Sequence, residues 1–193
     1  EITASAQGMR DKTLKNDLPS NHLEIVGTGG DESYSFNISM ASAFVLAAAG
    51  VPVTKHGNKS VSSKCGAADV LEALGAKIKT TPEQAKKVFD KCGFVFLHAQ
   101  VYHPAMRFAG PVRADLGVRT VFNVLGPLTN PARAEYQLLG VYSHTAVRPL
   151  CEVLSKLGTK RVIAVYGEDG MDEVSVSDKT YCCEYKDGEY KEY

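Results

Sequence analysis

Residues 22–31 read His-Leu-Glu-Ile-Val-Gly-Thr-Gly-Gly-Asp, a short apolar segment that runs directly into a glycine-rich turn. The pattern predicts a strand over residues 22–26 and a loop from Gly27 to Asp31. Three glycines in four residues permit positive φ angles and let backbone N–H groups approach an anion such as phosphate. A plain glycine turn between a strand and a helix would have the same composition. The loop matches neither a Walker A motif nor the GxGxxG dinucleotide fingerprint.

Strands and helices alternate along the rest of the chain. We expect helices over residues 39–49, 67–74, 82–92, 104–116 and 143–157, and strands over residues 51–55, 94–97, 138–142 and 161–166. A hairpin turn is expected at Asp187-Gly188. Apolar strands without polar alternation are typical of sheets that are buried on both faces. The sequence therefore predicts an α/β fold with a mixed, largely parallel sheet flanked by helices.

The composition excludes several broad classes of protein. The chain has 193 residues with 22 basic and 22 acidic side chains, which argues against nucleic-acid or polybasic membrane binding. No apolar run reaches transmembrane length. The five cysteines have neither zinc-finger nor CxxC spacing, so we expect reduced thiols and a cytoplasmic protein.

A second polar loop follows the strand expected over residues 51–55. Residues 55–64 read Lys-His-Gly-Asn-Lys-Ser-Val-Ser-Ser-Lys, which places three lysines and three serine hydroxyls in one segment. On a parallel sheet this loop and the glycine loop would emerge at the same carboxyl edge, where ligands bind in open α/β sheets. The loop suits a polyphosphate, although a solvated basic loop is the alternative interpretation.

Two further features carry charge suited to a substrate or a metal. Asp172 and Glu173 are adjacent in a loop, and Mg²⁺ usually takes one or two protein carboxylates together with phosphate oxygens and water. Arg113 could hold a carboxylate through two hydrogen bonds. A surface acidic pair and an exposed helical arginine are the alternatives to these two interpretations.

Together, these segments resemble the anthranilate phosphoribosyltransferase family. The resemblance runs from about Leu23 to the C-terminus and is specific because several short motifs occur in one order. The matching segments are residues 27–31, 36–39, 55–64, 111–113, 123–131 and 170–175. The resemblance implies transfer of the phosphoribosyl group from 5-phosphoribosyl 1-diphosphate to anthranilate, with Mg²⁺ as cofactor.

The resemblance also assigns site residues. It implies phosphoribosyl diphosphate contacts at Gly27, Gly30, Asp31, Ser35, Asn37, Ile38, Ser39, Met40, Lys55, His56, Gly57, Asn58, Lys59, Ser60, Val61, Ser62, Ser63 and Ala67. It implies anthranilate contacts at Gly27, Asn58 and Arg113, and Mg²⁺ ligands at Ser39, Asp172 and Glu173. Met40 and Ala67 depart from the hydroxyl residues common in the family, but the backbone N–H groups at both positions survive.

The family combines an α/β domain of the nucleoside phosphorylase/phosphoribosyltransferase type with a small helical domain that mediates homodimer formation. By this resemblance, residues 1–21 are a remnant of the helical domain and a linker. Residues 22–193 are an α/β phosphoribosyltransferase domain that is incomplete at its C-terminus. Dimerisation is expected of the full-length protein, and neither a nucleic acid nor a membrane is an expected partner.

Two alternative functions fit parts of the pattern. A pyrimidine nucleoside phosphorylase would use a related glycine loop but would not need the Asp172–Glu173 pair. A non-enzymatic nucleic-acid-binding paralogue should have a basic surface and lack metal ligands. The anthranilate amine is already a nucleophile, so no catalytic nucleophile is expected. His56 and His103 are candidate proton acceptors by position, and orienting or structural histidines are the alternative.

Overall fold

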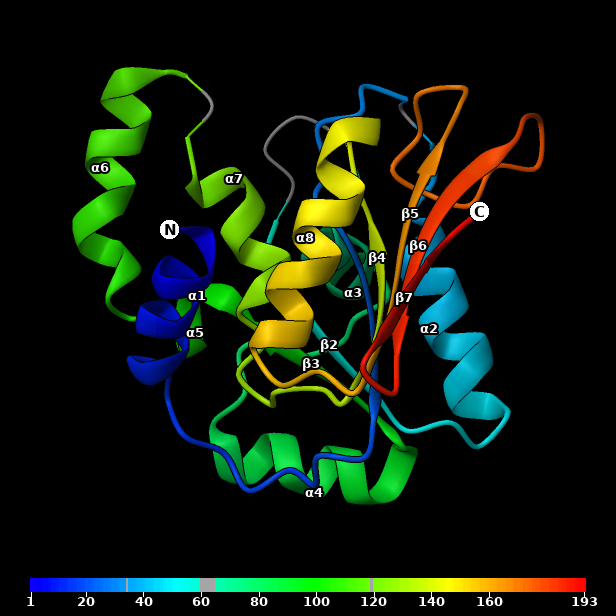
Figure 1. Ribbon diagram of the computed structural model, residues 1–193. Coiled ribbons are helices and arrows are strands. Elements are labelled where there is room, and N and C mark those ends of the chain that lie inside the picture. The colour runs from blue at the N-terminus through cyan, green and yellow to red at the C-terminus, as the bar shows by residue number, and fades with distance from the viewer. Residues whose placement is uncertain (34, 60–64, 119) are drawn as a thin grey trace.

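The computed structural model describes residues 1–33, 35–59, 65–118 and 120–193 (Figure 1). Within these residues, seven strands form one sheet in the order β3-β2-β1-β4-β5-β6-β7. Strands β1 to β5 are mutually parallel, whereas β6 and β7 are antiparallel to their neighbours. The strands are β1 (Leu23–Gly27), β2 (Val53–Gly57), β3 (Phe94–His98), β4 (Tyr136–Gly140), β5 (Arg161–Gly167), β6 (Thr180–Lys186) and β7 (Glu189–Glu192).

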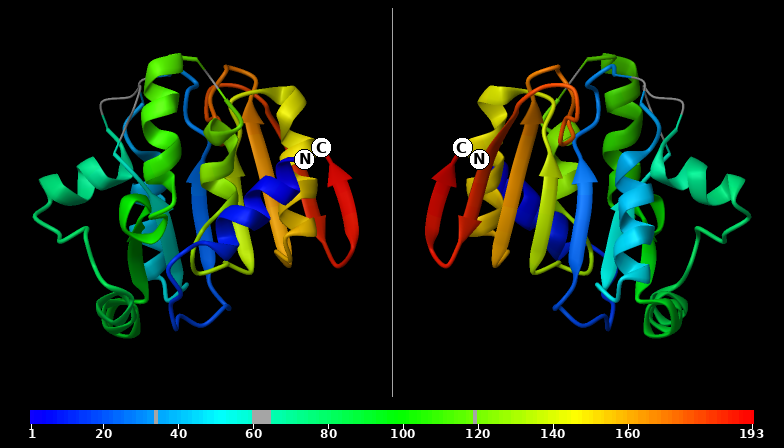
Figure 2. Two further views of the ribbon diagram at one scale, coloured as in Figure 1. Left: turned by 90° about the vertical axis from the view of Figure 1, so that its left-hand side faces the viewer. Right: turned by 90° about the vertical axis from the view of Figure 1, so that its right-hand side faces the viewer.

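Helices cover both faces of this sheet. Figure 1 shows α2 on one face and α1, α7 and α8 on the other, and the further views of Figure 2 agree with this layering. The helices are α1 (Ile2–Asp11), α2 (Ile38–Ala48), α3 (Ala67–Ala73), α4 (Pro82–Cys92), α5 (Ala99–Tyr102), α6 (Met106–Leu116), α7 (Phe122–Leu125) and α8 (His144–Lys156), with a 3₁₀ turn η1 (Gly126–Leu128). The predicted mixed, largely parallel α/β sheet is confirmed.

The strand order places a topological switch point at β1. The chain proceeds from β1 outward to β2 and β3, and then returns to the other side of β1 for β4 and β5. Loops after β1 and β4 therefore leave adjacent strands in opposite directions. Ligands in open α/β sheets bind at such a point, outside the carboxyl ends of the strands. The glycine loop that follows β1 lies at this position.

The core divides between the two faces because successive strand residues point to opposite sides. On β3, Phe96 packs with Met40 of α2 in one cluster, whereas Val95 and Leu97 belong to a cluster on the other face. The largest cluster joins β4, β5 and β6 to α8, and it includes Ala6 of α1. Helix α1 is therefore packed against the core of the sheet.

A buried arginine ties α1 to that core. Arg10 is 6% exposed, its Nε donates to the carbonyl of Leu128 at 2.7 Å, and its Nη1 donates to the carbonyl of Leu157 at 3.0 Å. Burial lowers the pKa of Arg10 to about 10, so the group remains charged at neutral pH. Hydrogen bonds to carbonyls satisfy a buried cation that would otherwise be costly.

Most predicted elements are present with shifts of one or two residues at their ends. The helix expected from Pro104 is the main correction: α6 begins at Met106, because Pro104 and Ala105 form a turn in which Met106 N bonds to His103 O. The short elements α5, α7 and η1 were not predicted. The expected hairpin at Asp187-Gly188 joins β6 to β7. No helix among the described residues is long and apolar enough to cross a membrane.

Candidate functional site

The glycine loop after β1 has the backbone conformation that the sequence predicts. Gly29 and Gly30 have φ angles of 66° and 79°, in the left-handed region that favours glycine. Thr28 fastens the loop to the end of β4: its N–H donates to the carbonyl of Gly140, and its Oγ1 accepts from Tyr142 N, both at 2.9 Å. The loop is therefore held at the switch point between β1 and β4.

The loop after β5 lies over the ends of β1 and β4. A Cβ atom at Gly140 would overlap the carbonyl oxygen of Asp172, and one at Gly27 would collide with the Asp172 carboxylate. Only glycine therefore permits this close approach at the two strand ends. Gly140 was not among the predicted site residues. The sequence did contain a signal for it: Gly140 ends an apolar strand, as Gly27 does.

The predicted metal ligands, one on α2 and two in the loop after β5, come together beside the glycine loop. The backbone N–H of Gly29 donates to Asp172 Oδ2 at 2.7 Å. The Ser39 hydroxyl, in the first turn of α2, donates to Glu173 Oε1 at 3.1 Å, although the two residues are 134 positions apart. The structure therefore brings Ser39, Asp172 and Glu173 to the edge of the sheet beside the glycine loop.

Burial raises the pKa of both carboxyl groups. It raises the pKa of Asp172 to about 6, with the nearby Asp31 carboxylate adding to the rise. Burial, and then the charge of Asp172, raises the pKa of Glu173 to about 7. Desolvation and like charges both disfavour the ionised form of a carboxyl group. A bound cation would favour the ionised form and so lower both pKa values.

The donor set suits Mg²⁺. The protein offers two carboxylates and one hydroxyl, and Mg²⁺ typically completes its octahedral shell with water and substrate phosphate oxygens. Among the described residues, no three His, Cys, Asp or Glu side chains gather into a group that could hold a metal by themselves. The fit is therefore to a cation that arrives with a phosphorylated ligand.

Lys55 supplies a buried positive charge behind the site. It is 3% exposed, and its Nζ donates to the carbonyl of Ile25 at 2.5 Å. Burial lowers its pKa to about 8, whereas Glu24, Glu173 and Asp172 favour its charged form. Glu24 is fully buried on β1, and its Oε1 accepts from His56 N at 3.2 Å. The end of β2, which leads to the second loop, thus lies beside a buried lysine, Lys55, and a buried glutamate, Glu24.

Of the two described lysines in the second loop, Lys55 is buried and Lys59 pairs with an acidic side chain of α3. Lys59 Nζ lies 2.6 Å from Glu72 Oε2 of α3, and both side chains are about half exposed. Asn58 Oδ1 accepts from Lys59 N at 2.8 Å. A polyphosphate would therefore compete with Glu72 for Lys59. The predicted contacts at Ser60, Val61, Ser62 and Ser63 lie outside the described residues.

The backbone N–H of Met40 takes part in the cap of α2. Asn37 is the N-cap of this helix, and its Oδ1 accepts from Met40 N at 2.8 Å. The Met40 side chain is 1% exposed and packs in the core. The contact of Met40 with phosphoribosyl diphosphate stays a prediction, and a phosphate would compete with Asn37 for this N–H. Ile38 is the first residue of α2, and Ala67 the first of α3.

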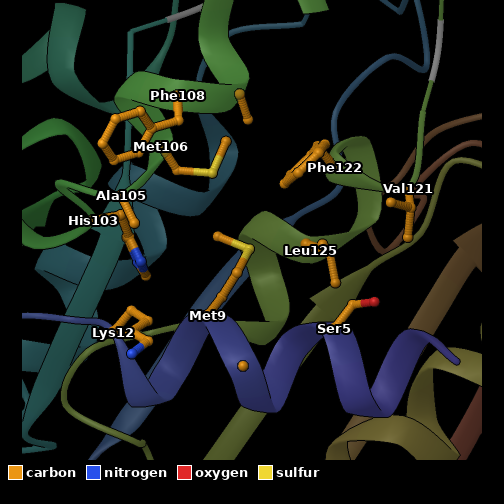
Figure 3. Close-up of a pocket in the computed structure, with 12 residues that line it drawn as sticks. Ser5, Met9, Lys12, His103, Ala105, Met106, Phe108, Val121, Phe122 and Leu125 are labelled. Atoms are coloured by element: carbon orange, nitrogen blue, oxygen red, sulfur yellow. The ribbon is translucent and has the colours of Figure 1, made fainter.

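Arg113 lies in the last turn of α6. Its guanidinium carbon is 5.4 Å from the ring centre of Phe122 in α7. Phe122 also lines an apolar pocket of about 320 Å³ between α1, α6 and α7 (Figure 3). The contact of Arg113 with anthranilate stays a prediction.

Two histidines in ring contact connect this pocket to the second loop. His103 lines the pocket, and its ring centre is 4.9 Å from that of His56. Burial lowers the pKa of His56 to about 3 and that of His103 to about 4. His56 Nδ1 lies 3.2 Å from the carbonyl of Gly126, which orients the ring. Both imidazoles are therefore neutral at physiological pH.

The fold is thus an α/β domain whose mixed sheet has a switch point, with a glycine-rich loop and a buried carboxylate pair side by side at that point. A family model described as "Glycosyl transferase family, a/b domain" matches residues 20–193, and the chain belongs to this family. Two curated relatives of the chain are named anthranilate phosphoribosyltransferase. The chain is 56% identical over 193 residues to the one from Lachnoclostridium phytofermentans and 58% identical to that from Methanobrevibacter smithii.

The solved structures give the same result. The crystal structure of anthranilate phosphoribosyltransferase from Thermus thermophilus matches with a TM-score of 0.89 and 46% identity. The enzyme from Saccharomyces cerevisiae, solved in complex with PRPP and Mg, matches with a TM-score of 0.85 and 32% identity. Each match covers 100% of this chain but only 57% and 54% of those chains. The chain likewise spans 57% and 58% of the two relatives from L. phytofermentans and M. smithii.

Proposed function

We propose that the whole protein transfers the 5-phosphoribosyl group from 5-phosphoribosyl 1-diphosphate to anthranilate, giving N-(5-phosphoribosyl)anthranilate and diphosphate, the second step of tryptophan synthesis from chorismate. The observation that carries this proposal is the meeting of Asp172, Glu173 and Ser39 beside the glycine loop at the switch point. A yeast relative binds PRPP and Mg, and another yeast structure contains 4-fluoroanthranilate.

The residues at the sheet edge act by positioning and charge. Displacement of diphosphate from the ribose gives a leaving group with concentrated negative charge, so donors fixed in advance lower the barrier. When bound, Mg²⁺ supplies positive charge to the diphosphate oxygens. Asp172 and Glu173 would hold that ion, and the N–H groups of the glycine loop would contact the ligand. The neutral amine of anthranilate needs no activation by a protein nucleophile.

The metal assignment is tested by the double variant Asp172→Asn/Glu173→Gln. The amides keep the shape of both side chains but remove their charge, so we expect Mg²⁺-dependent turnover to fall at least about a hundredfold, as for loss of metal ligands and their partners. Turnover is followed by the loss of anthranilate fluorescence over a Mg²⁺ titration. Turnover equal to that of the wild type at saturating Mg²⁺ would show that the pair does not hold the metal.

The acceptor assignment is tested by Arg113→Ala. Loss of a charge-assisted contact to the anthranilate carboxylate should raise KM for anthranilate about tenfold or more, while KM for the ribosyl donor stays unchanged. Arg107 lies earlier on α6, over the ring of Phe108, and Arg107→Ala is the matched control. An effect confined to the ribosyl donor would contradict the assigned role.

The pyrimidine nucleoside phosphorylase alternative remains distinguishable. Such an enzyme would bind phosphate and a nucleoside without needing the carboxylate pair. Phosphorolysis of thymidine by the wild type, retained in Asp172→Asn, would favour it. The balanced charge, 22 basic and 22 acidic residues, and the retained carboxylates disfavour the nucleic-acid-binding alternative.

We also propose that the whole protein is a cytoplasmic homodimer. No cysteine forms a disulfide among the described residues, which suits a reducing compartment. Helix α6 exposes Phe108, Val112 and Leu116 at intervals of four residues, and an apolar stripe of this kind supports burial against another surface. Sedimentation velocity of the whole protein tests the dimer.

A further inference from the structure

The loop between β5 and β6, residues 168–179, carries the Asp172–Glu173 pair in a series of turns and bends. Two side-chain hydrogen bonds within this loop converge on Asp169. Asp169 Oδ2 accepts from the hydroxyls of Ser175, at 2.6 Å, and Ser177, at 2.8 Å. We propose that Asp169 is a positioning residue that holds Asp172 and Glu173 in the arrangement a divalent cation requires. This inference rests on the proposed metal-binding function of that pair.

The Asp169–Ser175 hydrogen bond encloses the metal-binding pair. Asp169 precedes Asp172 and Ser175 follows Glu173, so the bond joins the two ends of the segment that presents both carboxylates. Two backbone hydrogen bonds tie this segment to the end of β5: Gly167 N donates to Met171 O at 2.9 Å, and Gly170 N donates to Gly167 O at 2.8 Å. A closed segment has fewer conformations to lose when it binds an ion. The carboxylates are thus presented in advance.

The end of β5 is shaped to receive the Asp169 carboxylate. A Cβ atom at Gly167 would lie 2.5 Å from Asp169 Oδ1, so the absent side chain leaves room for this oxygen. Ser175 Oγ extends the network by accepting from the N–H groups of Ser177, at 3.0 Å, and Asp178, at 2.9 Å. The hydroxyls of Ser175 and Ser177 hold the pKa of Asp169 below its usual value, which keeps its acceptor oxygens ionised.

Charge alone could also explain an effect of Asp169 on a bound cation, and the loop contains a matched control. Asp178 is an exposed carboxylate in the same loop, and its Oδ1 accepts from the N–H of its chain neighbour Lys179 at 2.7 Å. Asp178→Ala removes the same charge as Asp169→Ala but leaves the Asp169–Ser175 bond in place. Ser175→Ala does the reverse, because it breaks that bond with no change in charge.

The test is a titration of the protein with Mn²⁺ in the presence of diphosphate, in which electron paramagnetic resonance reports free Mn²⁺. Partners that orient metal ligands typically contribute roughly ten- to a hundredfold in affinity. We expect the Kd for Mn²⁺ to rise by about that factor in Asp169→Ala and in Ser175→Ala. In Asp178→Ala it should change by no more than about twofold, because exposed charges are screened. An equal loss in Asp169→Ala and Asp178→Ala, or unchanged affinity in both Asp169→Ala and Ser175→Ala, would overturn the proposal.

Hydrogen–deuterium exchange separates failure of this inference from failure of the proposed function. The Gly167 and Gly170 amides bond to backbone carbonyls, so they report the order of the loop rather than the loss of a side-chain acceptor. Faster exchange at both is expected in Asp169→Ala but not in Asp178→Ala. If the wild type binds Mn²⁺ and this exchange is unaltered, only the role of Asp169 is wrong. If the wild type binds Mn²⁺ no better than Asp172→Asn, the metal function is wrong, and the inference falls with it.

Discussion

Gly140 allows Asp172 to reach the switch point because the strand end has no side chain in the way. Gly140→Ala would force the Asp172 carbonyl to move. Overpacking of this kind costs about 1–3 kcal/mol, so we expect a lower free energy of unfolding and at least about a tenfold loss in Mg²⁺-dependent kcat/KM. Urea denaturation and the fluorescence assay measure the two effects.

The control for this variant is Gly8→Ala in α1, where an added Cβ meets nothing within 4 Å. Alanine is the better helix former, so Gly8→Ala should leave activity unchanged and stabilise the protein by up to about 1 kcal/mol. Full activity of Gly140→Ala would mean that the loop after β5 does not need this close approach.

His103 gives a pH dependence whose sign can be derived. Burial lowers its pKa to about 4, below the ordinary value of 6.5. Above about pH 6.5 the histidine is neutral in both folded and unfolded states. As pH falls toward 4, the unfolded state binds a proton that the folded state refuses, so stability is lost over that window.

His103→Gln removes the group that binds this proton. Comparison with the variant therefore isolates the contribution of His103 to the pH dependence of stability from the contributions of the other buried groups. Between about pH 8 and pH 5, the wild type should lose about 2 kcal/mol of unfolding free energy relative to the variant. Urea denaturation of both proteins at the two pH values measures this difference. A constant difference between them would show that the imidazole is not shielded from protons in the folded state.

Among the elements, α2 begins at a residue, Asn37, that caps the helix and is also proposed to contact a phosphate. Its Oδ1 caps the helix, and its Nδ2 donates to the carbonyl of Cys65 at 2.8 Å, in front of α3. Asn37→Ala should cost about 1 kcal/mol of stability because the cap is lost. Asn37→Asp keeps a good cap but adds negative charge where a phosphate is proposed to bind.

Both variants lose the Nδ2 hydrogen bond to Cys65, and only Asn37→Ala also loses the cap, so we expect the melting temperature to fall further in Asn37→Ala. The affinity for phosphoribosyl diphosphate should fall further in Asn37→Asp, because the added charge repels the phosphate. Differential scanning fluorimetry and isothermal titration calorimetry measure the two quantities. Unchanged affinity in Asn37→Asp would place the phosphate away from the start of α2.

Elements with strong local signals were predictable from the sequence. Thr81 caps α4 with Pro82 at its first position, and Gly93 ends it in the left-handed conformation, as the residue types indicate. Helices α5 and α7 lacked such signals, since each has only four residues and no side-chain cap. Helix α5 lies against β3 and α7 lies against α1, and a local sequence pattern does not contain such long-range contacts.

The sequence predicts which segments form the candidate site, but not which hydrogen bonds and ion pairs their side chains make. Motif order placed Asp172 and Glu173 near the glycine loop, and the hydrogen bonds to Gly29 and Ser39 confirm that grouping. The Lys59–Glu72 pair and the occupied N–H of Met40 could not be predicted, because both depend on which neighbour a polar group meets after folding.

At the scale of the whole molecule, a single sheet organises the two halves of the site. Strands β1 and β2 bring the loops proposed to contact phosphate, and β5 brings the carboxylates across the switch point. Helix α1 packs on the same core as α8, so residues 1–11 are integrated with the α/β layers. The division at residue 21 into a helical remnant and an α/β domain stays a prediction.

We propose that phosphoribosyl transfer to anthranilate takes place at this edge of the sheet. Phosphorus NMR of the whole protein with phosphoribosyl diphosphate, anthranilate and Mg²⁺ tests this proposal. We expect the donor signals to be replaced by free diphosphate and one new phosphomonoester, and only when anthranilate and Mg²⁺ are both present. Donor signals that persist under these conditions, or diphosphate release that does not depend on anthranilate, would contradict it.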